Sequence, residues 1–310
     1  MRCHLLGDMC GKRGAVGVRP LAGGRVGGVL MLVLSALTFA RAMPAAKVVA
    51  LETRIWSCEF HSVALDRDMR FLVVLPSAAR EAPPVPVIYL LHGRGRNETT
   101  LLDDAFTRRT LLGSGCAIVL PRGLDGWYVN SPAVPEDKYA DYVDEVIALA
   151  EAEFPLRRDP SGRAITGWSM GGYGAAHTFV RRPGDFAALA TIIGIIDYPR
   201  PVAGPPEQNY PVQPRFGADP AGWDALNPRL ALARVQPRPL LVAYADRAAE
   251  CRMNERFIAE AKARGFPVRE LRIPGEHVFA VVREALPSVL GFLELQLIPP
   301  SPTPPPSHPR

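Results

Sequence analysis

The sequence has few histidines and cysteines, and it lacks an apolar run long enough to span a bilayer. Six of its 310 residues are histidine and five are cysteine. The apolar run at 29–40 has about 12 residues, whereas a spanning helix needs about 20. The cysteines after it, Cys58, Cys116 and Cys251, are too widely separated for a zinc site. One disulfide is possible in an oxidising compartment, but we expect three buried or partly buried thiols.

The sequence also lacks an excess of either charge over most of its length. Six of the 36 basic residues and one of the 31 acidic residues lie within residues 1–42, which leaves 30 of each sign in the remainder. A neutral body gives no electrostatic reason to expect nucleic acid or an anionic membrane as partner.

The two ends differ in composition from the body. Residues 1–42 combine a cationic stretch, the apolar run and a small-x-small pattern, Ala40-Arg41-Ala42, which is typical of a cleaved signal peptide. An uncleaved anchor or a buried helix is the alternative. The proline-rich residues 298–310 are expected to form a disordered tail. This division predicts a secreted or periplasmic protein with one domain over residues 43–297.

Short apolar runs alternate with helical patterns along the body. Such an order predicts an α/β fold whose central sheet is mostly parallel and covered by helices on both faces. Residues 51–65 could add antiparallel edge strands, and the Pro- and Gly-rich residues 199–239 read as an irregular excursion. The expected strands are 69–75, 85–91, 116–120, 164–168, 187–196, 240–245 and 268–273, and the expected helices are 139–154, 171–181, 254–264 and 278–295.

The segment Gly167-Trp168-Ser169-Met170-Gly171 matches G-x-S-x-G, the nucleophile elbow. The expected strand before it and helix after it supply the context that the motif requires. The two glycines let the strand and the helix crowd the turn, so that the hydroxyl points into a cleft. Ser169 is therefore the predicted nucleophile.

A serine nucleophile needs a base, and elimination among the six histidines leaves His277. His4 and His308 lie in the expected signal and tail. His61 lies in an edge-strand pattern, His92 in a Gly-rich loop and His177 two turns into the helix after Ser169. His277 follows the last strand and precedes the last helix, which is the place of the base in the chain order Ser, acid, His.

The base in turn needs a carboxylate to fix its tautomer. Asp246 directly follows the expected strand 240–245 and is the first choice. Asp197, after the preceding apolar stretch, is the runner-up. Asp219 and Asp224 read as turn or cap residues, and Glu276 is adjacent to the base in sequence, which usually directs side chains apart.

The oxyanion of an acyl-transfer intermediate needs two N–H donors. We expect one from Met170, the residue after the nucleophile, and one from Arg94 in the loop His92-Gly93-Arg94-Gly95. Trp127, Tyr128 and Trp168 are candidates for the substrate pocket, although plain core packing explains them equally well.

At these residues the chain resembles esterases of the esterase D type, which include S-formylglutathione hydrolases, tributyrin and feruloyl esterases and mycolyltransferases. The segments that carry the resemblance are residues 62–65, 71–76, 90–93, 126–132, 167–174, 216–223 and 227–228. The resemblance covers about residues 50–295. It implies an α/β-hydrolase fold, a triad of Ser169, Asp246 and His277, and an acyl-enzyme mechanism without metal or cofactor. The family often has Gly shortly before the acid, where this chain has Ala243-Tyr244-Ala245, and Trp two positions after the histidine, where this chain has Phe279.

The function expected from these features is hydrolysis of small-molecule or carbohydrate esters by a serine esterase. Three alternatives stay open at this point. The acyl group could pass to a sugar or another alcohol, the same fold could cleave peptides, or the chain could be a secreted binding protein that has lost catalysis.

Overall fold

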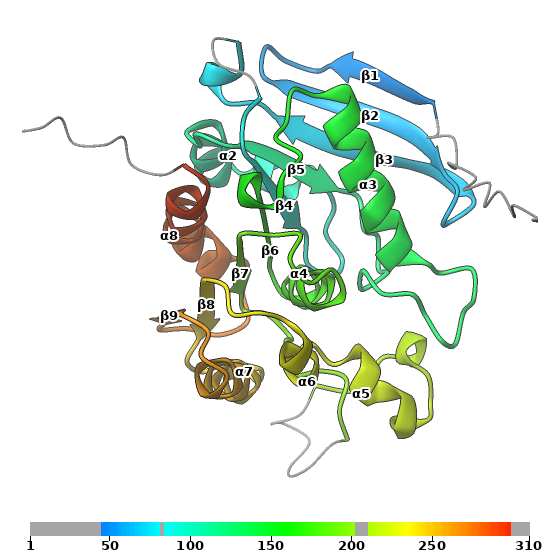
Figure 1. Cartoon of the computed structure of the whole chain (residues 1–310), viewed down its shortest axis with the longest axis vertical. Coiled ribbons are helices and arrows are strands. Elements are labelled where there is room, and N and C mark those ends of the chain that lie inside the picture. The colour runs from blue at the N-terminus through cyan, green and yellow to red at the C-terminus, as the bar shows by residue number, and fades with distance from the viewer. Residues whose placement is uncertain (1–44, 81–83, 202–209, 299–310) are drawn as a thin grey trace, which may run out of the picture. The chain divides into compact units, whose positions relative to one another are not determined.

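The computed structural model describes residues 45–80, 84–201 and 210–298, and within them nine strands form one mixed sheet (Figure 1). The signal peptide expected over residues 1–42 and all but the first residue of the tail expected over 298–310 lie outside the described residues. No helix in the described part of the chain is long and apolar enough to cross a membrane.

The sheet has the order β1-β2-β3-β5-β4-β6-β7-β8-β9. The run from β5 through β9 is parallel, while β1, β2 and β3 pair antiparallel at one end. The strands are β1 (Ala46–Ala50), β2 (Ile55–Ser62), β3 (Arg67–Val74), β4 (Val87–Leu91), β5 (Ala117–Pro121), β6 (Arg163–Gly167), β7 (Ala188–Ile192), β8 (Leu240–Ala245) and β9 (Val268–Ile273).

Helices cover both faces of the sheet, as the sequence predicts. Helices α3 (Tyr139–Glu153), α4 (Met170–Arg181) and α7 (Cys251–Ala263) pack into one apolar core. The short α1 (Thr100–Asp103) and α2 (Ala105–Leu112) and the long α8 (Phe279–Leu297) pack into the other. The excursion contains α5 (Trp223–Leu226) and α6 (Pro228–Ala231).

The central strands contribute side chains to both cores, because successive side chains point to opposite faces of a strand. In β4, Val87, Tyr89 and Leu91 belong to the core of α3, α4 and α7, while Ile88 and Leu90 belong to the core of α8. A strand buried on both faces must be apolar throughout, which is why the sequence shows continuous apolar runs rather than alternation.

Two differences from the expected elements have local causes. The run 187–196 is a strand only up to Ile192, because Ile193 has a φ of 41° and turns the chain out of the sheet. Helices α1 and α2 have no counterpart among the expected helices. They are short, and α2 is preceded by its N-cap Asp104, whose carboxylate accepts hydrogen bonds from the N–H groups of Phe106 and Thr107.

The thiols of Cys58, Cys116 and Cys251 are all free, as expected. Cys58 and Cys116 are buried and Cys251 is partly buried. Burial raises the pKa of Cys58 and of Cys116 to about 12, so both stay protonated at neutral pH.

His177 makes folding sensitive to acid. It packs in the interior against the ring of Tyr173, at 5.5 Å between centroids. Burial, and secondly the charge of Arg181, lower the pKa of His177 to about 4. Because the pKa of His177 is lower in the folded than in the unfolded protein, the contribution of the neutral, buried ring to the free energy of unfolding is complete above the unfolded pKa of about 6.5. It is lost as the pH falls toward 4, by up to about 3 kcal/mol.

We therefore expect His177→Phe, which keeps an aromatic ring against Tyr173, to flatten the decline in the free energy of unfolding between pH 6.5 and pH 4. Urea titrations across this range measure it. The control is His61→Gln. It should not flatten this decline, because Asp68 and Asp66 raise the pKa of this exposed histidine rather than lower it. An equal slope in wild type and His177→Phe would contradict the prediction.

Candidate active site

Ser169 lies at the sharp turn between β6 and α4. Its φ of 56° and ψ of −119° place it in a region that L-residues rarely occupy. A β-carbon at Gly167 would lie 2.3 Å from the carbonyl oxygen of Gly171, and one at Gly171 would lie 2.0 Å from the carbonyl oxygen of Leu91. Both positions must therefore be glycine for the strand and the helix to approach this closely.

His277 comes from the loop between β9 and α8 and meets the serine directly. Its Nε2 lies 2.8 Å from Ser169 Oγ, within hydrogen-bond distance, and its side chain is 36% exposed. The structure thus brings together two residues that are 108 positions apart in the sequence. The serine hydroxyl can donate to Nε2 when Nδ1 carries the ring proton.

The carboxylate behind this imidazole belongs to Glu250. Its Oε1 lies 2.9 Å from His277 Nδ1, and its side chain is only 3% exposed. Glu250 is the residue just before α7, where the unpaired N–H groups of the helix favour a negative charge. A buried carboxylate at this distance favours the protonated form of Nδ1.

Asp246, the carboxylate expected at this position, contacts the turn before His277 instead. It directly follows β8, and its Oδ1 accepts a hydrogen bond of 3.0 Å from the N–H of Gly275. The short side chain of Asp246 reaches only groups near the end of β8, such as the N–H of Gly275. Glu250 lies four residues further along and has one more methylene group. The expected contact between Asp246 and the imidazole is therefore not present in this structure, where Glu250 takes that position.

The runner-up, Asp197, also lies elsewhere. It is buried and accepts hydrogen bonds from Arg229, Asn227 and Arg256. This cluster joins the chain after β7 to α6 and α7. In this structure the buried Asp197 thus pairs with partly exposed arginines.

His92 fixes the loop that follows β4. The N–H of Gly123 donates to its Nε2 at 2.8 Å, so Nδ1 must carry the proton. Nδ1 lies 2.8 Å from the carbonyl oxygen of Gly93 and therefore donates to it. Burial lowers the pKa of His92, which keeps the ring neutral and preserves both contacts.

This anchoring also orients the peptide between Gly93 and Arg94. In a planar trans peptide the N–H points opposite to the C=O. With the Gly93 carbonyl turned toward His92, the Arg94 N–H points away from it. A β-carbon at Gly93 would lie 3.3 Å from Cβ of Ser169, so this peptide is next to Ser169. Met170, at the first position of α4, has an N–H without an intrahelical acceptor.

A small cavity of about 150 Å³ opens above Ser169. Trp168 lines it, as expected. Trp127 and Tyr128 do not, and the alternative of core packing is correct for both. Trp127 is 1% exposed and packs against Tyr173 and Phe216, while Tyr128 is fully buried and donates to the carbonyl oxygen of His92. The lining residues are Gly93, Arg94, Arg96, Trp168, Ser169, Ile193, His277, Val278, Phe279 and Val282.

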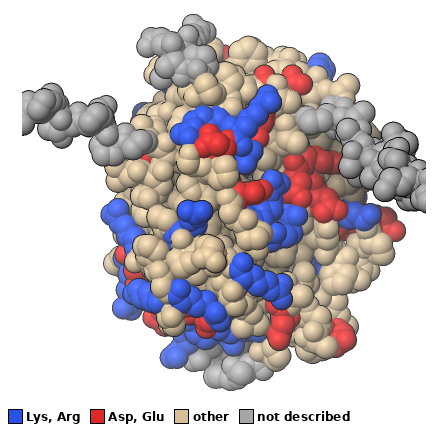
Figure 2. All heavy atoms as spheres, in the orientation of Figure 1, with Lys and Arg blue, Asp and Glu red and all other residues tan. Residues whose placement is uncertain are grey.

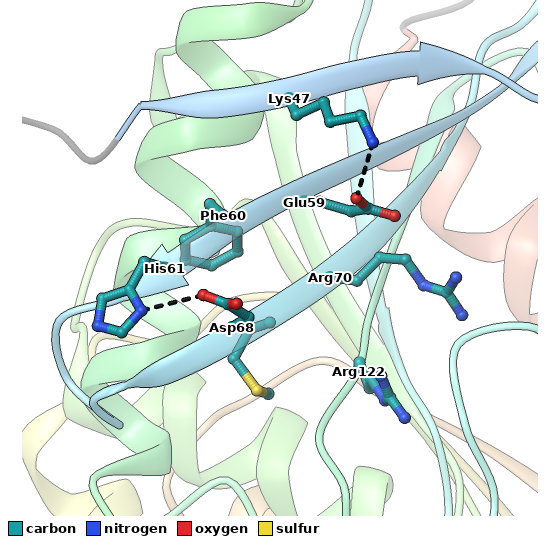
Figure 3. Close-up of a pocket in the computed structure, with 8 residues that line it drawn as sticks. Lys47, Glu59, Phe60, His61, Asp68, Arg70 and Arg122 are labelled. Atoms are coloured by element: carbon teal, nitrogen blue, oxygen red, sulfur yellow. Dashed lines mark hydrogen bonds and ion pairs between the residues drawn. The ribbon is translucent and has the colours of Figure 1, made fainter.

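Another hollow, of about 310 Å³, lies over the outer face of β1, β2 and β3 (Figure 3). Its charges are largely paired, with Lys47 3.5 Å from Glu59 and His61 3.0 Å from Asp68. Basic and acidic side chains are likewise intermingled on the face that Figure 2 shows. No serine or cysteine lines this hollow, so it lacks the chemistry of the cavity at Ser169.

Comparison with known proteins gives three kinds of likeness. A family model described as "Putative esterase" matches residues 62–239. Esterase Rv1288 of Mycobacterium tuberculosis is 31% identical over 149 residues, which are 46% of this chain and 33% of that protein. S-formylglutathione hydrolase of Mus musculus is 28% identical over 159 residues, which are 44% of this chain and 55% of that protein. The chain thus spans about a third to about half of the length of these curated relatives.

Among solved structures, the S-formylglutathione hydrolase of Agrobacterium tumefaciens superimposes with a TM-score of 0.67 at 19% identity. The match covers 81% of this chain and 99% of that chain. Together with the parallel sheet and its two helical layers, this likeness shows the α/β-hydrolase fold.

The crowding at the turn predicts opposite effects for two helical glycines. Gly171→Ala should lower the free energy of unfolding by about 1–3 kcal/mol or more, because its methyl group meets backbone. Gly291→Ala in α8, where nothing lies within 4 Å of the added carbon, should raise it by up to about 1 kcal/mol. Urea denaturation of both variants checks this. Similar stabilities for the two variants would show that the turn can relax.

Proposed function

Since the chain belongs to the esterase family whose model matches residues 62–239, we propose that it hydrolyses carboxylic esters with Ser169 as nucleophile. His277 is then the general base, and Glu250 is the carboxylate that holds it. The observation that carries the proposal is the continuous relay of contacts, 2.8 Å from Oγ to Nε2 and 2.9 Å from Nδ1 to Oε1.

Acylation follows from this arrangement. Ser169 Oγ attacks the ester carbonyl while its proton passes to His277 Nε2. Nδ1 of the imidazolium that forms lies 2.9 Å from Oε1 of Glu250, so the buried carboxylate stabilises the new positive charge. The backbone N–H groups of Met170 and Arg94 hold the oxyanion of the tetrahedral intermediate.

Collapse of this intermediate breaks the bond to the alcohol, and His277 returns its proton to the departing oxygen. Water then enters, is deprotonated by His277 and attacks the acyl-enzyme through a second tetrahedral intermediate. That intermediate releases the acid, and the proton returns to Ser169. The cavity of about 150 Å³ favours a short acyl group.

Ser169→Ala should reduce hydrolysis of p-nitrophenyl acetate by at least about 10³-fold, because the acyl-enzyme cannot form. A fluorophosphonate should label the wild type at one site per chain and leave the Ala variant unlabelled, as read by intact-protein mass spectrometry. Retained turnover or labelling in the Ala variant would refute the proposal.

Two carboxylates near the base offer a matched comparison. Glu250→Gln should lower kcat by about 10²- to 10⁴-fold, since a neutral amide neither fixes the tautomer nor stabilises the imidazolium. Asp246→Asn should lower kcat far less, because its carboxylate contacts the N–H of Gly275 and two exposed arginines, Arg247 and Arg272, rather than the imidazole. Steady-state kinetics of both variants, with folding checked by circular dichroism, measure this. The reverse order of effects would assign the orienting role to Asp246.

A further inference from the structure

Two arginines border the cavity at Ser169. Arg94 and Arg96 both line it, both are exposed, and both belong to the loop that His92 anchors. The remaining ionisable side chain of the lining is His277, and no carboxylate is part of it. The mouth of the cavity therefore carries two fixed positive charges.

Neither guanidinium is neutralised by a carboxylate within the described residues. Arg94 donates from Nη1 to the amide oxygen of Gln213 at 3.1 Å, which is a neutral partner. The Arg96 guanidinium carbon lies 5.7 Å from the centroid of the Phe279 ring. Many other arginines are paired, for example Arg181 with Asp144 at 2.6 Å.

Nearby acids do not cancel this charge. Glu250 is buried behind His277 and faces its Nδ1, on the far side of the ring from Ser169. Burial is the largest cause that raises the pKa of Tyr210; among the nearby charges Arg94 lowers it, and Asp125 and Glu250 raise it. Glu98, from the same loop, is buried and pairs with Arg70 of β3, not with Arg94 or Arg96.

The proposed chemistry does not use these two side chains. The oxyanion is held by backbone N–H groups. Arg is also the side chain best suited to bind a carboxylate or phosphate in two-pronged geometry.

We propose that Arg94 and Arg96 bind an anionic group, a carboxylate or phosphate, on the alcohol half of a short-chain ester. The acyl half occupies the cavity, because its volume of about 150 Å³ leaves little room for more. The anionic half then lies at the mouth, where the arginines are exposed. This inference rests on the proposed function, since it names the substrate class of that same site.

The test compares 4-carboxyphenyl acetate with its neutral analogue, 4-carbamoylphenyl acetate. The wild type should show a higher kcat/KM for the anionic ester, by about three- to tenfold at low ionic strength. Arg96→Gln should remove most of this preference, and Arg96→Lys, which keeps the charge, should retain most of it. Added salt at 0.5 M should shrink the preference, because exposed charges are screened.

The matched control is Arg109→Gln, an exposed arginine of α2 that does not line the cavity. Its ratio of the two kcat/KM values should equal that of the wild type. Equal ratios in wild type and Arg96→Gln would overturn the inference while hydrolysis that depends on Ser169 leaves the esterase proposal standing. If neither ester is turned over and fluorophosphonate fails to label Ser169, the esterase proposal and the inference fail together.

Discussion

The close approach of β4, β6 and α4 at Ser169 is the constraint on which the site depends. A single added carbon at Gly171 would lie 2.0 Å from the carbonyl oxygen of Leu91, so the chain turns there with almost no space left. The unusual φ of Ser169 persists because the packed elements around it leave no alternative. The hydroxyl is consequently held at one place at the carboxyl edge of the sheet, and the other groups are positioned relative to it.

Two loops meet the serine, and each is held by a polar side chain that does not touch it. The neutral imidazole of His92 joins the loop after β4 to Gly123 after β5, which directs the Arg94 N–H. Asp246 holds Gly275, two residues before His277. Both residues stood among the candidates for the reaction itself, yet their hydrogen bonds are with backbone groups, and they fix the two loops that lie beside the serine.

Much of the fold could be predicted because its strands are buried on both faces and therefore read as continuous apolar runs. Where prediction failed, the cause was a local conformation or a distant contact. Ile193 ends β7 through its backbone angle, which an apolar residue type does not reveal. Trp127 and Tyr128 stand in a segment that resembles a cleft lining, but rings from α4 and the excursion enclose Trp127, and both side chains are buried.

The sequence by itself pointed to Ser169 and His277, whose side chains the tertiary structure brings together. A G-x-S-x-G turn restricts backbone geometry locally, and only six histidines were available for elimination. Only the tertiary structure shows which carboxylate lies beside the imidazole. Asp246 and Glu250 lie four residues apart in one connection, and either could follow the rule of chain order. Which of them reaches Nδ1 depends on side-chain length and on where α7 begins relative to the last loop, and spacing along the chain does not encode that relation.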